Sequence, residues 1–531
     1  MSLDIRRVLV ADGISSECSD RLRQAGLKVT ETGKLSVDQL IEMLQGYDAL
    51  LVRSATQVTG AVFDGCRRLK LVGRAGTGTD NIDTQAATKH GVIVMNTPGG
   101  NTVSAAEHTC VLITALSRQL AAACSSLKDG HWKRSAFVGS ELYGKTLAVL
   151  GLGRIGRQVA HRMSAFGMKV TGYDPIVTAE AARQFGVEKR ELDDIWSDAD
   201  YITVHTPLIP QTKRLISADS LSRCKRGVRV VNVARGGIVD EAALLAALES
   251  GQCAGAGLDV FAEEPPTDLR LVRHPAVICT PHLGANTGEA QRRVAVELAE
   301  QIVSAVTGGP LEGVVNGAGV TDALSPANKP YVTLGKALGV LLSPGLGTQV
   351  DKCQLQIITA GREMAERQAC LRAGLLVGLL TGHGGEVNLL SAAPLAAELG
   401  VAVSLSEHTA GDPGAGGGTV TARLTTADGA DTTAVTGTLR GEQATLLELY
   451  EAQFETGVTL QGRMMFFQED GHPNALVELI TALAAADARP MSVLASVSTS
   501  GATQILAVRL PQGQPQLQQL DHTKLYLQTD F

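Results

Sequence analysis

The sequence contains few aromatic residues, no patterned cysteines and no long apolar runs. Phe, Trp and Tyr make up 3% of the 531 residues, so stacking platforms for single-stranded nucleic acid are not expected. Lys and Arg number 47 against 54 Asp and Glu, and this small acidic excess argues against a nucleic-acid surface built on bulk charge. No uncharged apolar stretch approaches the roughly 18 residues of a membrane span. We therefore predict no nucleic-acid partner and no membrane partner.

The nine cysteines form no C-x-x-C pair, and their number is odd. This spacing predicts no disulfide framework and no zinc site, and we predict no metal site of any other kind. Free thiols suit a reducing compartment. The first residues, MSLDIRRVLVADG, are charged and lack the apolar centre of a signal peptide. These features predict a soluble protein of the cytoplasm (cytosol).

Apolar sequence is abundant and is arranged in short blocks. Hydrophobic residues make up 44% of the chain, and at ~150 residues per domain its length predicts three or four domains. Helical patterns separate continuously apolar runs, which is typical of parallel strands buried on both faces. The first such runs occupy 8–11, 49–54, 69–73 and 91–96. An Ala-rich pattern then predicts a long helix over 101–129.

A second series of apolar runs follows at the spacing of βα units, over 146–151, 169–174, 201–206, 228–233, 255–260 and 277–282. The predicted fold class is therefore α/β, with two doubly wound parallel sheets, one flavodoxin-like and one of the Rossmann type. An amphipathic helix is expected at 288–307.

The regular βα pattern of the sequence ends at about residue 310. A linker with Gly and Pro leads into a mixed α+β region, which a glycine-rich loop interrupts at 409–418. The last part of the chain has the order β-α-β-β-α-β of the ferredoxin-like motif, with its second helix at 515–521.

The run GLGRIG at 151–156 follows a predicted strand and opens a predicted helix, which is the context of a dinucleotide site. Gly151 permits the tight turn, Gly153 lets the backbone approach a pyrophosphate, and Gly156 lets helix and strand pack closely. The helix N-terminus offers free N–H groups to the phosphates. Asp174 ends the next strand, 18 residues after Gly156, where an acid can bind a ribose 2′-OH.

Three further polar residues follow strands of the same predicted sheet: Arg235, Glu264 and His282. Each alone is explained by an ordinary structural role, but α/β sheets bind ligands at the carboxyl ends of their strands, so together they predict a site. The run GRAGTGTDNID at 73–83 also follows a strand, and no acid-ended strand stands at the distance that a second dinucleotide site requires. We expect that loop to contact substrate.

These motifs carry a family resemblance. GLGRIG, ARGGIVDE, LDVF-x-EEPP and PHLGA resemble the D-isomer-specific 2-hydroxyacid dehydrogenases over about residues 5–310. The runs VRSAT, GRAGTGTDNID and MNTPGGN, and the length of the tail, are similar to the long-form members that oxidise 3-phosphoglycerate. The resemblance implies NAD as cofactor and 3-phosphohydroxypyruvate as product, in the first step of serine synthesis.

The mechanism implied by the resemblance also fits the residue types. His282 acts as the general base toward the substrate hydroxyl, and Glu264 stabilises the protonated imidazole. Arg235 binds the substrate carboxylate and polarises the C2 oxygen with its planar donor fork. In this reading the cofactor does the redox chemistry and the protein positions it.

The resemblance extends the binding sites beyond these residues. The expected NAD-binding residues are Thr77, Gly151, Gly153, Arg154, Ile155, Gly156, Asp174, Thr206, Pro207, Val233, Ala234, Arg235, Asp259, His282, Leu283, Gly284 and Ala285. The expected substrate-binding residues are Arg53, Ser54, Arg74, Gly76, Arg134, Arg235 and His282, with the arginines on the phosphate and Arg134 reaching across a dimer interface.

The resemblance also divides the chain. It implies a substrate-binding domain at 1–98 and 283–307, an NAD-binding domain at 99–282, an intervening domain at 308–455 and an ACT-like regulatory domain at 456–531. A homodimer or homotetramer is expected, and the Ala-rich helix at 101–124 suits close packing between subunits, although a core helix would look the same. In the ACT-like part Asn474 follows Pro473, where a Pro-Gly pair is usual, and this departure counts against serine binding.

Two rival functions share most of these motifs. A glyoxylate or hydroxypyruvate reductase has the same fold, but such chains usually stop near 330 residues. A corepressor of the C-terminal-binding-protein type has the same Arg/Glu/His set, but VRSAT, the arginines and the ACT-like tail disfavour it. Side reduction of other 2-oxo acids, such as 2-oxoglutarate, stays open.

Overall fold

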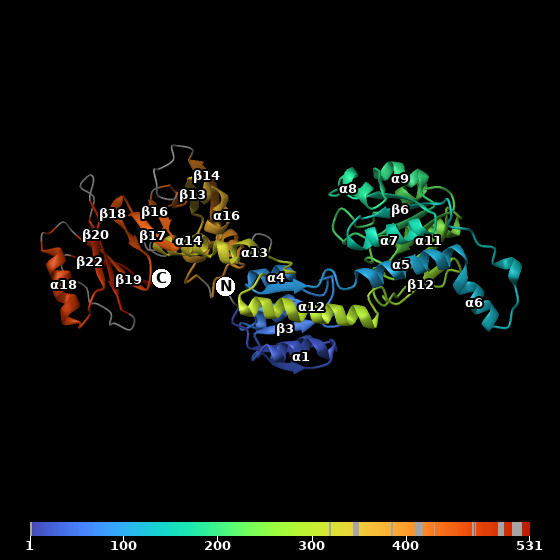
Figure 1. Ribbon diagram of the computed structural model, residues 1–531, viewed down its shortest axis with the longest axis horizontal. Helices are drawn as coiled ribbons and strands as arrows, with labels where there is room; N and C mark the ends of the chain where they lie inside the picture. The colour runs from blue at the N-terminus through green and yellow to red at the C-terminus, as the bar shows by residue number, and fades with distance from the viewer. Residues whose placement is uncertain are drawn as a thin grey trace.

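The computed structural model describes residues 3–317, 320–342, 350–383, 386–408, 418–429, 431–469, 472, 474–497, 504–511 and 523–531. These residues form four sheets, which Figure 1 shows as parts of an elongated molecule. The second sheet along the chain lies at one end and the first sheet lies next to it, while the third and fourth sheets follow toward the other end. Two α/β units therefore stand side by side, and two β-rich units extend from them.

The first sheet is parallel and has the order β2-β1-β3-β4-β5. Its strands are β1 Arg7–Val10, β2 Lys28–Glu31, β3 Ala49–Val52, β4 Leu71–Arg74 and β5 Ile93–Asn96, connected by α1 Ser16–Gln24, α2 Val37–Leu44, α3 Gly60–Gly65 and α4 Thr84–Lys89. The helix α12 Gly288–Thr307 returns to this sheet, where Leu298 and Ile302 join the core with Val8 and Val10. The predicted buried strands and the predicted helix at 288–307 are confirmed.

The second sheet is also parallel and has the order β12-β11-β10-β9-β6-β7-β8. Its strands are β6 Thr146–Leu150, β7 Lys169–Tyr173, β8 Glu188–Lys189, β9 Tyr201–Val204, β10 Val228–Asn232, β11 Cys253–Leu258 and β12 Val277–Cys279. Its helices are α5 Thr102–Ser117, α7 Arg154–Ala165, α8 Ala179–Gln184, α9 Leu192–Asp198, α10 Ala218–Arg223 and α11 Glu241–Glu249. The strand order reverses between β6 and β9, and open α/β sheets bind ligands in the crevice at such a reversal. Two doubly wound sheets, as predicted, are confirmed.

The single helix predicted over 101–129 is wrong. Gln119 adopts a left-handed conformation with φ 51°, which ends α5 and starts a separate helix, α6 Leu120–Lys128. α5 is packed against the second sheet, whereas α6 buries none of its residues and projects from the molecule in Figure 1. Among the described helices, none alone is long and apolar enough to cross a membrane; α5 and α6 pass that test only as a pair, bent by 67°.

Two strands of the first two sheets have no counterpart in the sequence prediction. β2 is an edge strand with mostly exposed residues, and β8 has only two residues. Neither carries the continuous apolar pattern of a buried parallel strand, so hydrophobicity gives no signal for them.

The linker after α12 adds to the edge of the first sheet. Val315 donates its N–H to the carbonyl of Val94 at 2.8 Å, and Asn96 donates its N–H to the carbonyl of Gly313 at 2.8 Å. The chain that leads to the third sheet is thereby paired with β5, the strand beside the candidate site.

The third sheet is mixed, with the order β14-β13-β15-β16-β17-β18. Its strands are β13 Gln354–Ala360, β14 Ala402–His408, β15 Thr419–Thr425, β16 Thr432–Arg440, β17 Gln443–Leu449 and β18 Ala452–Thr459, and its helices are α13 Val320–Ala323, α14 Lys329–Leu342, α15 Arg362–Glu366, α16 Gln368–Leu379 and α17 Ala392–Glu398. α14 and α16 approach each other so closely that a side chain would not fit between them at two glycines. A Cβ on Gly339 would overlap the carbonyl oxygen of Leu375, and a Cβ on Gly378 would overlap that of Lys336. The domain boundary predicted at 455 lies inside β18, whose pairing with β17 continues to Thr459.

The fourth sheet is antiparallel, with the order β20-β21-β19-β22. Its strands are β19 Arg463–Glu469, β20 Ser492–Ala495, β21 Ile505–Leu510 and β22 Thr523–Asp530, and α18 Ala475–Ala485 joins β19 to β20. This strand order is that of a ferredoxin-like sheet. The predicted helix at 515–521 lies outside the described residues, as do most of the predicted loop at 409–418 and Pro473.

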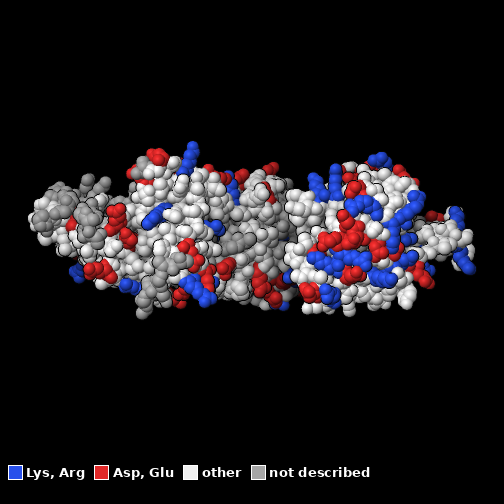
Figure 2. Space-filling view, turned by 90° about the horizontal axis from the view of Figure 1, so that it is seen from above, with Lys and Arg blue, Asp and Glu red and all other residues white. Residues whose placement is uncertain are grey.

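Charged side chains of both signs are intermixed on the face shown in Figure 2, most densely over the second sheet. That face carries no large patch of one sign among the described residues.

Candidate active site

The glycine turn after β6 has the geometry that a dinucleotide requires. Gly151 has φ 98°, and a Cβ there would lie 2.5 Å from the carbonyl oxygen of His205, while a Cβ on Gly156 would overlap the carbonyl oxygen of Gly151. A Cβ on Gly153, by contrast, would meet nothing within 4 Å. The turn is therefore closed toward the protein and open above Gly153, at the N-terminus of the 12-residue helix α7, where a pyrophosphate would approach.

The neighbouring strand offers a hydroxyl without a partner. The Thr206 Oγ1 atom, just past β9, is buried and has no hydrogen-bond partner among the described residues. A buried hydroxyl without a partner is unfavourable unless a ligand or water satisfies it. Its place beside the turn fits a bound NAD.

Asp174 lies directly under this turn. Its carboxylate accepts hydrogen bonds from the backbone N–H of Leu152 at 2.9 Å, of Ile176 at 2.9 Å and of Val177 at 3.2 Å. Burial raises the pKa of Asp174, but these three hydrogen bonds together outweigh it and hold the pKa below the ordinary value. The group is thus ionised at neutral pH. Oδ1 accepts two of the three bonds and Oδ2 accepts one, so Oδ2 keeps acceptor capacity for a ribose hydroxyl.

The predicted His–Glu pair is present. His282 Nδ1 lies 2.7 Å from Glu264 Oε2, and the backbone N–H of Phe261 donates to Glu264 Oε1 at 3.1 Å. Glu264 is therefore fixed at both oxygens. Because Nδ1 faces the carboxylate, Nε2 is the ring nitrogen left for a substrate proton.

Asp259 holds the loop that carries His282. Its buried carboxylate accepts from the hydroxyl of Thr280 at 2.6 Å and from the backbone N–H groups of Leu283 at 2.7 Å and Gly284 at 2.8 Å. Burial raises the pKa of Asp259, but hydrogen bonds from the loop and from His108 outweigh it and lower the pKa. We predicted Asp259 as an NAD contact, and its bonds in this structure are to the protein.

Arg235 reaches across to the first sheet. Its Nε donates to Asp80 Oδ2 at 2.9 Å and its Nη1 donates to the carbonyl of Ala234 at 2.7 Å. Its Nη2 lies so close to Gly78 that any Cβ there would overlap it. Glycine at 78 therefore makes room for the guanidinium.

Arginines of the first sheet gather at the same place. Burial and the charges of Arg235 and Arg53 together lower the pKa of Arg74 to about 10, against the opposing charges of Asp80 and Asp12. Three of the predicted anion-binding arginines thus lie within reach of one another's charge. Arg134 does not join them in this chain, because it lies exposed in a short 3-10 turn (Arg134–Ala136) beyond α6.

Polar residues that the sequence prediction did not single out support this cluster. Asp12 accepts from the backbone N–H groups of Arg53 and Thr56, both at 2.9 Å, and Asn81 donates to the carbonyl of Arg53 at 2.8 Å. A signal for Asp12 is the Asp-Gly pair after the first strand, since Asp12 is left-handed with φ 63°. Asn81 lies in the run at 73–83, which the sequence marked only as a whole.

The other predicted residues lie at strand ends, as expected. Thr206 and Pro207 follow β9, Val233 and Ala234 follow β10, Asp259 follows β11, and 282–285 follow β12, all on the second sheet. Thr77 and Gly76 follow β4 of the first sheet, where the backbone N–H of Gly76 donates to the Thr97 hydroxyl at 2.8 Å. Ser54 is exposed just past β3.

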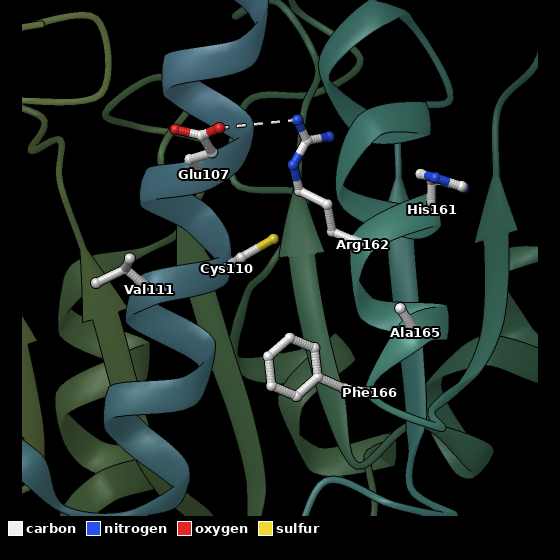
Figure 3. Close-up of a pocket in the computed structure, with 7 residues that line it drawn as sticks. All are labelled: Glu107, Cys110, Val111, His161, Arg162, Ala165 and Phe166. Carbon is white, nitrogen blue, oxygen red and sulfur yellow. Dashed lines mark ion pairs between the residues drawn. The ribbon is translucent and has the colours of Figure 1, made fainter.

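A separate hollow of about 560 Å³ opens between α5 and α7 (Figure 3). Cys110 and Phe166 form its floor, and Arg162 Nη2 lies 3.9 Å from Glu107 Oε1 at its rim. None of its lining residues was predicted for the site. Among the described residues, no cluster of three or more His, Cys, Asp or Glu is arranged to hold a metal ion.

Comparison with known proteins gives two family matches. The family described as "D-isomer specific 2-hydroxyacid dehydrogenase, NAD binding domain" matches residues 110–284. The family described as "D-3-phosphoglycerate dehydrogenase intervening domain" matches residues 327–448.

Curated relatives match over most of the chain. D-3-phosphoglycerate dehydrogenase of Sus scrofa is 46% identical over 505 residues, which cover 94% of each chain. The protein of the same name from Bacillus subtilis is 45% identical over 399 residues, 75% of each chain.

Solved structures match over more than half of the chain. A glyoxylate reductase from Paecilomyes thermophila is 27% identical with a TM-score of 0.55, over 59% of this chain and 99% of that one. D-lactate dehydrogenase from Aquifex aeolicus, complexed with NAD and lactic acid, is 30% identical with a TM-score of 0.51, over 57% of this chain and 96% of that one.

Proposed function

This chain belongs to the D-3-phosphoglycerate dehydrogenase family, and from that premise we propose that it oxidises 3-phosphoglycerate to 3-phosphohydroxypyruvate with NAD, the first step of L-serine biosynthesis. The observation that carries the proposal is one arrangement: a His–Glu pair and an arginine beside a dinucleotide turn, facing two further arginines of the neighbouring sheet. Such a site suits a small 2-hydroxy acid that also bears a phosphate.

His282 performs the proton transfer. Glu264 holds Nδ1, so Nε2 takes the proton of the C2 hydroxyl during oxidation and returns it in the reverse reaction. NAD, when bound, accepts the hydride from C2. The carboxylate of Glu264 stabilises the imidazolium that forms.

Arg235 holds the substrate carboxylate and polarises the C2 oxygen. Two of its nitrogens are already bonded, to Asp80 and to Ala234, which fixes the plane of the guanidinium. A guanidinium held in this way offers its remaining donors in a defined direction and loses little freedom when the substrate binds.

The substrate phosphate is bound by Arg53 and Arg74, with Arg134 supplied by a second subunit. The segment after α5 supports a homodimer, because α6 projects from the molecule and the segment exposes Leu120 at 59%, Leu127 at 56% and Trp132 at 82%. Exposed apolar groups that gather on a projecting segment are typical of subunit interfaces. Pairing of two such segments would bring Arg134 toward the partner's cleft.

The four sheets support the proposed division of the chain. The first sheet with α12 forms the substrate-binding domain, the second the NAD-binding domain, the third the intervening domain and the fourth an ACT-like regulatory domain. We place the last boundary after β18 rather than within it. All nine cysteines are free thiols, which supports a cytosolic location.

Initial rates with a panel of substrates test the function. We expect NAD-dependent oxidation of 3-phosphoglycerate to exceed that of D-glycerate, and NADH-dependent reduction of 3-phosphohydroxypyruvate to exceed that of glyoxylate, hydroxypyruvate and 2-oxoglutarate. Faster reduction of glyoxylate or unphosphorylated hydroxypyruvate would indicate a reductase. NADH binding without turnover of any of these substrates would favour a corepressor.

A further inference from the structure

His108 lies on α5 and reaches the loop that carries the catalytic histidine. Its Nε2 is 2.9 Å from the Thr280 hydroxyl and 3.3 Å from Asp259 Oδ1. Thr280 and Asp259 both belong to the second sheet, at the ends of β12 and β11. His108 thus bonds α5 to the base of the His282 loop, and Ser104 of the same helix bonds to Thr287 at the other end of that loop at 2.8 Å.

The hydrogen bonds of this group have one consistent assignment. Asp259 is ionised and can only accept, so the Thr280 hydroxyl, 2.6 Å away, donates to it. The Thr280 oxygen is then left as an acceptor, and His108 Nε2 must carry the hydrogen that it receives. His108 therefore fixes the direction of the Thr280 hydroxyl and contributes a second donor toward Asp259.

The loop needs such support because His282 has an unfavourable backbone. His282 is left-handed, with φ 55°, and a residue with a side chain keeps that conformation only when its surroundings hold it. Hydrogen bonds to Asp259 hold the loop in this conformation. The Asp259 carboxylate accepts from the backbone N–H groups of Leu283 and Gly284, and the Asp259 carbonyl accepts from the N–H of His282 at 2.9 Å.

α5 is a suitable anchor. It is a 16-residue helix with a largely buried face, and it packs against α7, β10, β11 and β12. The His108 side chain is 19% exposed, so its bonds to Thr280 and Asp259 are partly shielded from water. A hydrogen bond from this helix therefore attaches the loop to the packed second sheet.

We propose that His108 is a positioning residue for the reaction: through Thr280 and Asp259 it holds the loop that aims His282 at Glu264 and the substrate. The proposal rests on the proposed function for its kinetic consequence, but its structural part concerns only the contact between His282 and Glu264. No role in binding substrate or NAD is assigned to His108.

The test compares His108→Leu, which removes the donor, with His108→Gln, whose amide keeps one, and with His161→Leu on the exposed face of α7 as control. We expect His108→Leu to lower kcat for 3-phosphoglycerate roughly ten- to hundredfold, as a small misplacement of a catalytic group does, with KM for NAD unchanged. His108→Gln should recover most of the loss, and His161→Leu should match the wild type. The proposal is overturned if KM for NAD rises by as large a factor as kcat falls in His108→Leu, or if His108→Gln does not recover kcat.

A second measurement does not depend on turnover. Carbon-13-labelled histidine, with the His282 signal assigned through His282→Ala, reports the surroundings of the His282 ring in each variant. Loosening of the contact with Glu264 should change the chemical shift of that signal at pH 7 in His108→Leu and leave it in place in His108→Gln. An unchanged chemical shift in a folded His108→Leu protein overturns the proposal even if the substrate differs from 3-phosphoglycerate.

Thr280→Val removes the hydroxyl oxygen that accepts the hydrogen bond from His108 Nε2. It should lower kcat at least as much as His108→Leu does, because it also removes the hydrogen bond from Thr280 to Asp259. The double variant should be little worse than Thr280→Val alone, because that variant has already lost the bond from His108. Additive losses would contradict a shared pathway.

Discussion

The two parallel sheets have the same architecture, but the groups that we propose bind anions differ between them. The second sheet presents a glycine turn, a helix N-terminus and Asp174, so in the proposed function backbone N–H groups meet the phosphates of the cofactor. The first sheet presents arginines, whose loops are held by Asp12 and Asn81. Backbone N–H groups suit a ligand that is always the same, whereas arginine side chains suit a small substrate that must enter, be turned over and leave.

The comparison implies a division of labour. In the proposed function the second sheet holds the cofactor and transfers the proton through His282, whose loop is bonded to Asp259. In the same proposal the first sheet recognises the phosphate. Arg235 belongs to the second sheet but is bonded to Asp80 of the first, so it is the residue at which both functions meet.

The largest effect is expected on the second sheet, in His282→Ala. Loss of the general base should lower kcat roughly 10²–10⁴-fold, while NADH binding stays near wild type because no NAD phosphate contact is removed. Steady-state kinetics and fluorescence titration with NADH measure the two quantities. If kcat falls less than tenfold, His282 is not the base.

Glu264→Gln serves as the companion variant. The amide keeps the shape of Glu264 but not the charge that stabilises the imidazolium, so kcat should fall while NADH binding stays near wild type. An unchanged kcat would mean that the pair at 2.7 Å does not persist during turnover.

The next effect concerns cofactor choice. The ionised Asp174 would face the 2′-phosphate of NADP, and like charges in a partly desolvated site cost on the order of a few kcal/mol. We expect kcat/KM for NAD to exceed that for NADP by at least tenfold, and Asp174→Asn to narrow the gap. Equal values for the two cofactors in the wild type would remove Asp174 from the site.

A smaller effect tests whether the first sheet is completed by a partner. Arg134→Ala should raise KM for 3-phosphoglycerate much more than KM for NAD, because only a phosphate contact is lost. If Arg134 is an ordinary exposed residue, no constant should change by more than ~2-fold, within the ~0.5 kcal/mol typical of surface substitutions. If neither KM value changes in Arg134→Ala, phosphate recognition is confined to Arg53 and Arg74.

The smallest expected effect is on stability, at the opposite end of the first sheet. Asp48 accepts from the backbone N–H groups of Arg6 and Arg7, both at 2.8 Å, and from Arg68 Nε at 2.8 Å. Burial raises the pKa of Asp48, but these bonds outweigh it and lower the pKa. The stabilisation is therefore present above the pKa of about 3.9 of an unfolded Asp and is lost as pH falls through the lower folded value.

Asp48→Asn should accordingly lower the free energy of unfolding by about 1 kcal/mol at pH 7 and by less near pH 3, with kinetic constants unchanged at pH 7. Urea unfolding at both pH values measures this. A variant that loses as much stability at pH 3 as at pH 7 would show that the ionised carboxylate is not the stabilising form.

The sequence predicted the parts of the fold that depend on hydrophobic pattern. Buried strands such as β3 and β6 and the amphipathic α12 were predicted closely, because burial on both faces or on one stripe leaves a direct signal. The break at Gln119 was missed because nothing in the Ala-rich pattern encodes a left-handed residue there. The edge strand β2 was missed because exposed strands carry no continuous apolar run.

The site divides in the same way. Residues marked by motifs, such as Gly151 and His282, were predicted because turns and strand ends place them in sequence. His108 was not predicted, since its role depends on a helix packed across the second sheet, and Asp80 was not predicted, since its partner is 155 residues away. Contacts between elements distant in the chain require the tertiary structure.

The ratio of kcat/KM for 3-phosphoglycerate to that for D-glycerate, measured with NAD in the wild type and in Arg74→Gln, tests the division of labour most directly. The wild type should prefer the phosphorylated substrate, and Arg74→Gln should narrow that preference at least tenfold, the ~1.5–3 kcal/mol of a charged hydrogen bond, while KM for NAD stays the same. An unchanged preference in Arg74→Gln, or an equal rise in KM for NAD, would contradict the assignment of phosphate recognition to the first sheet.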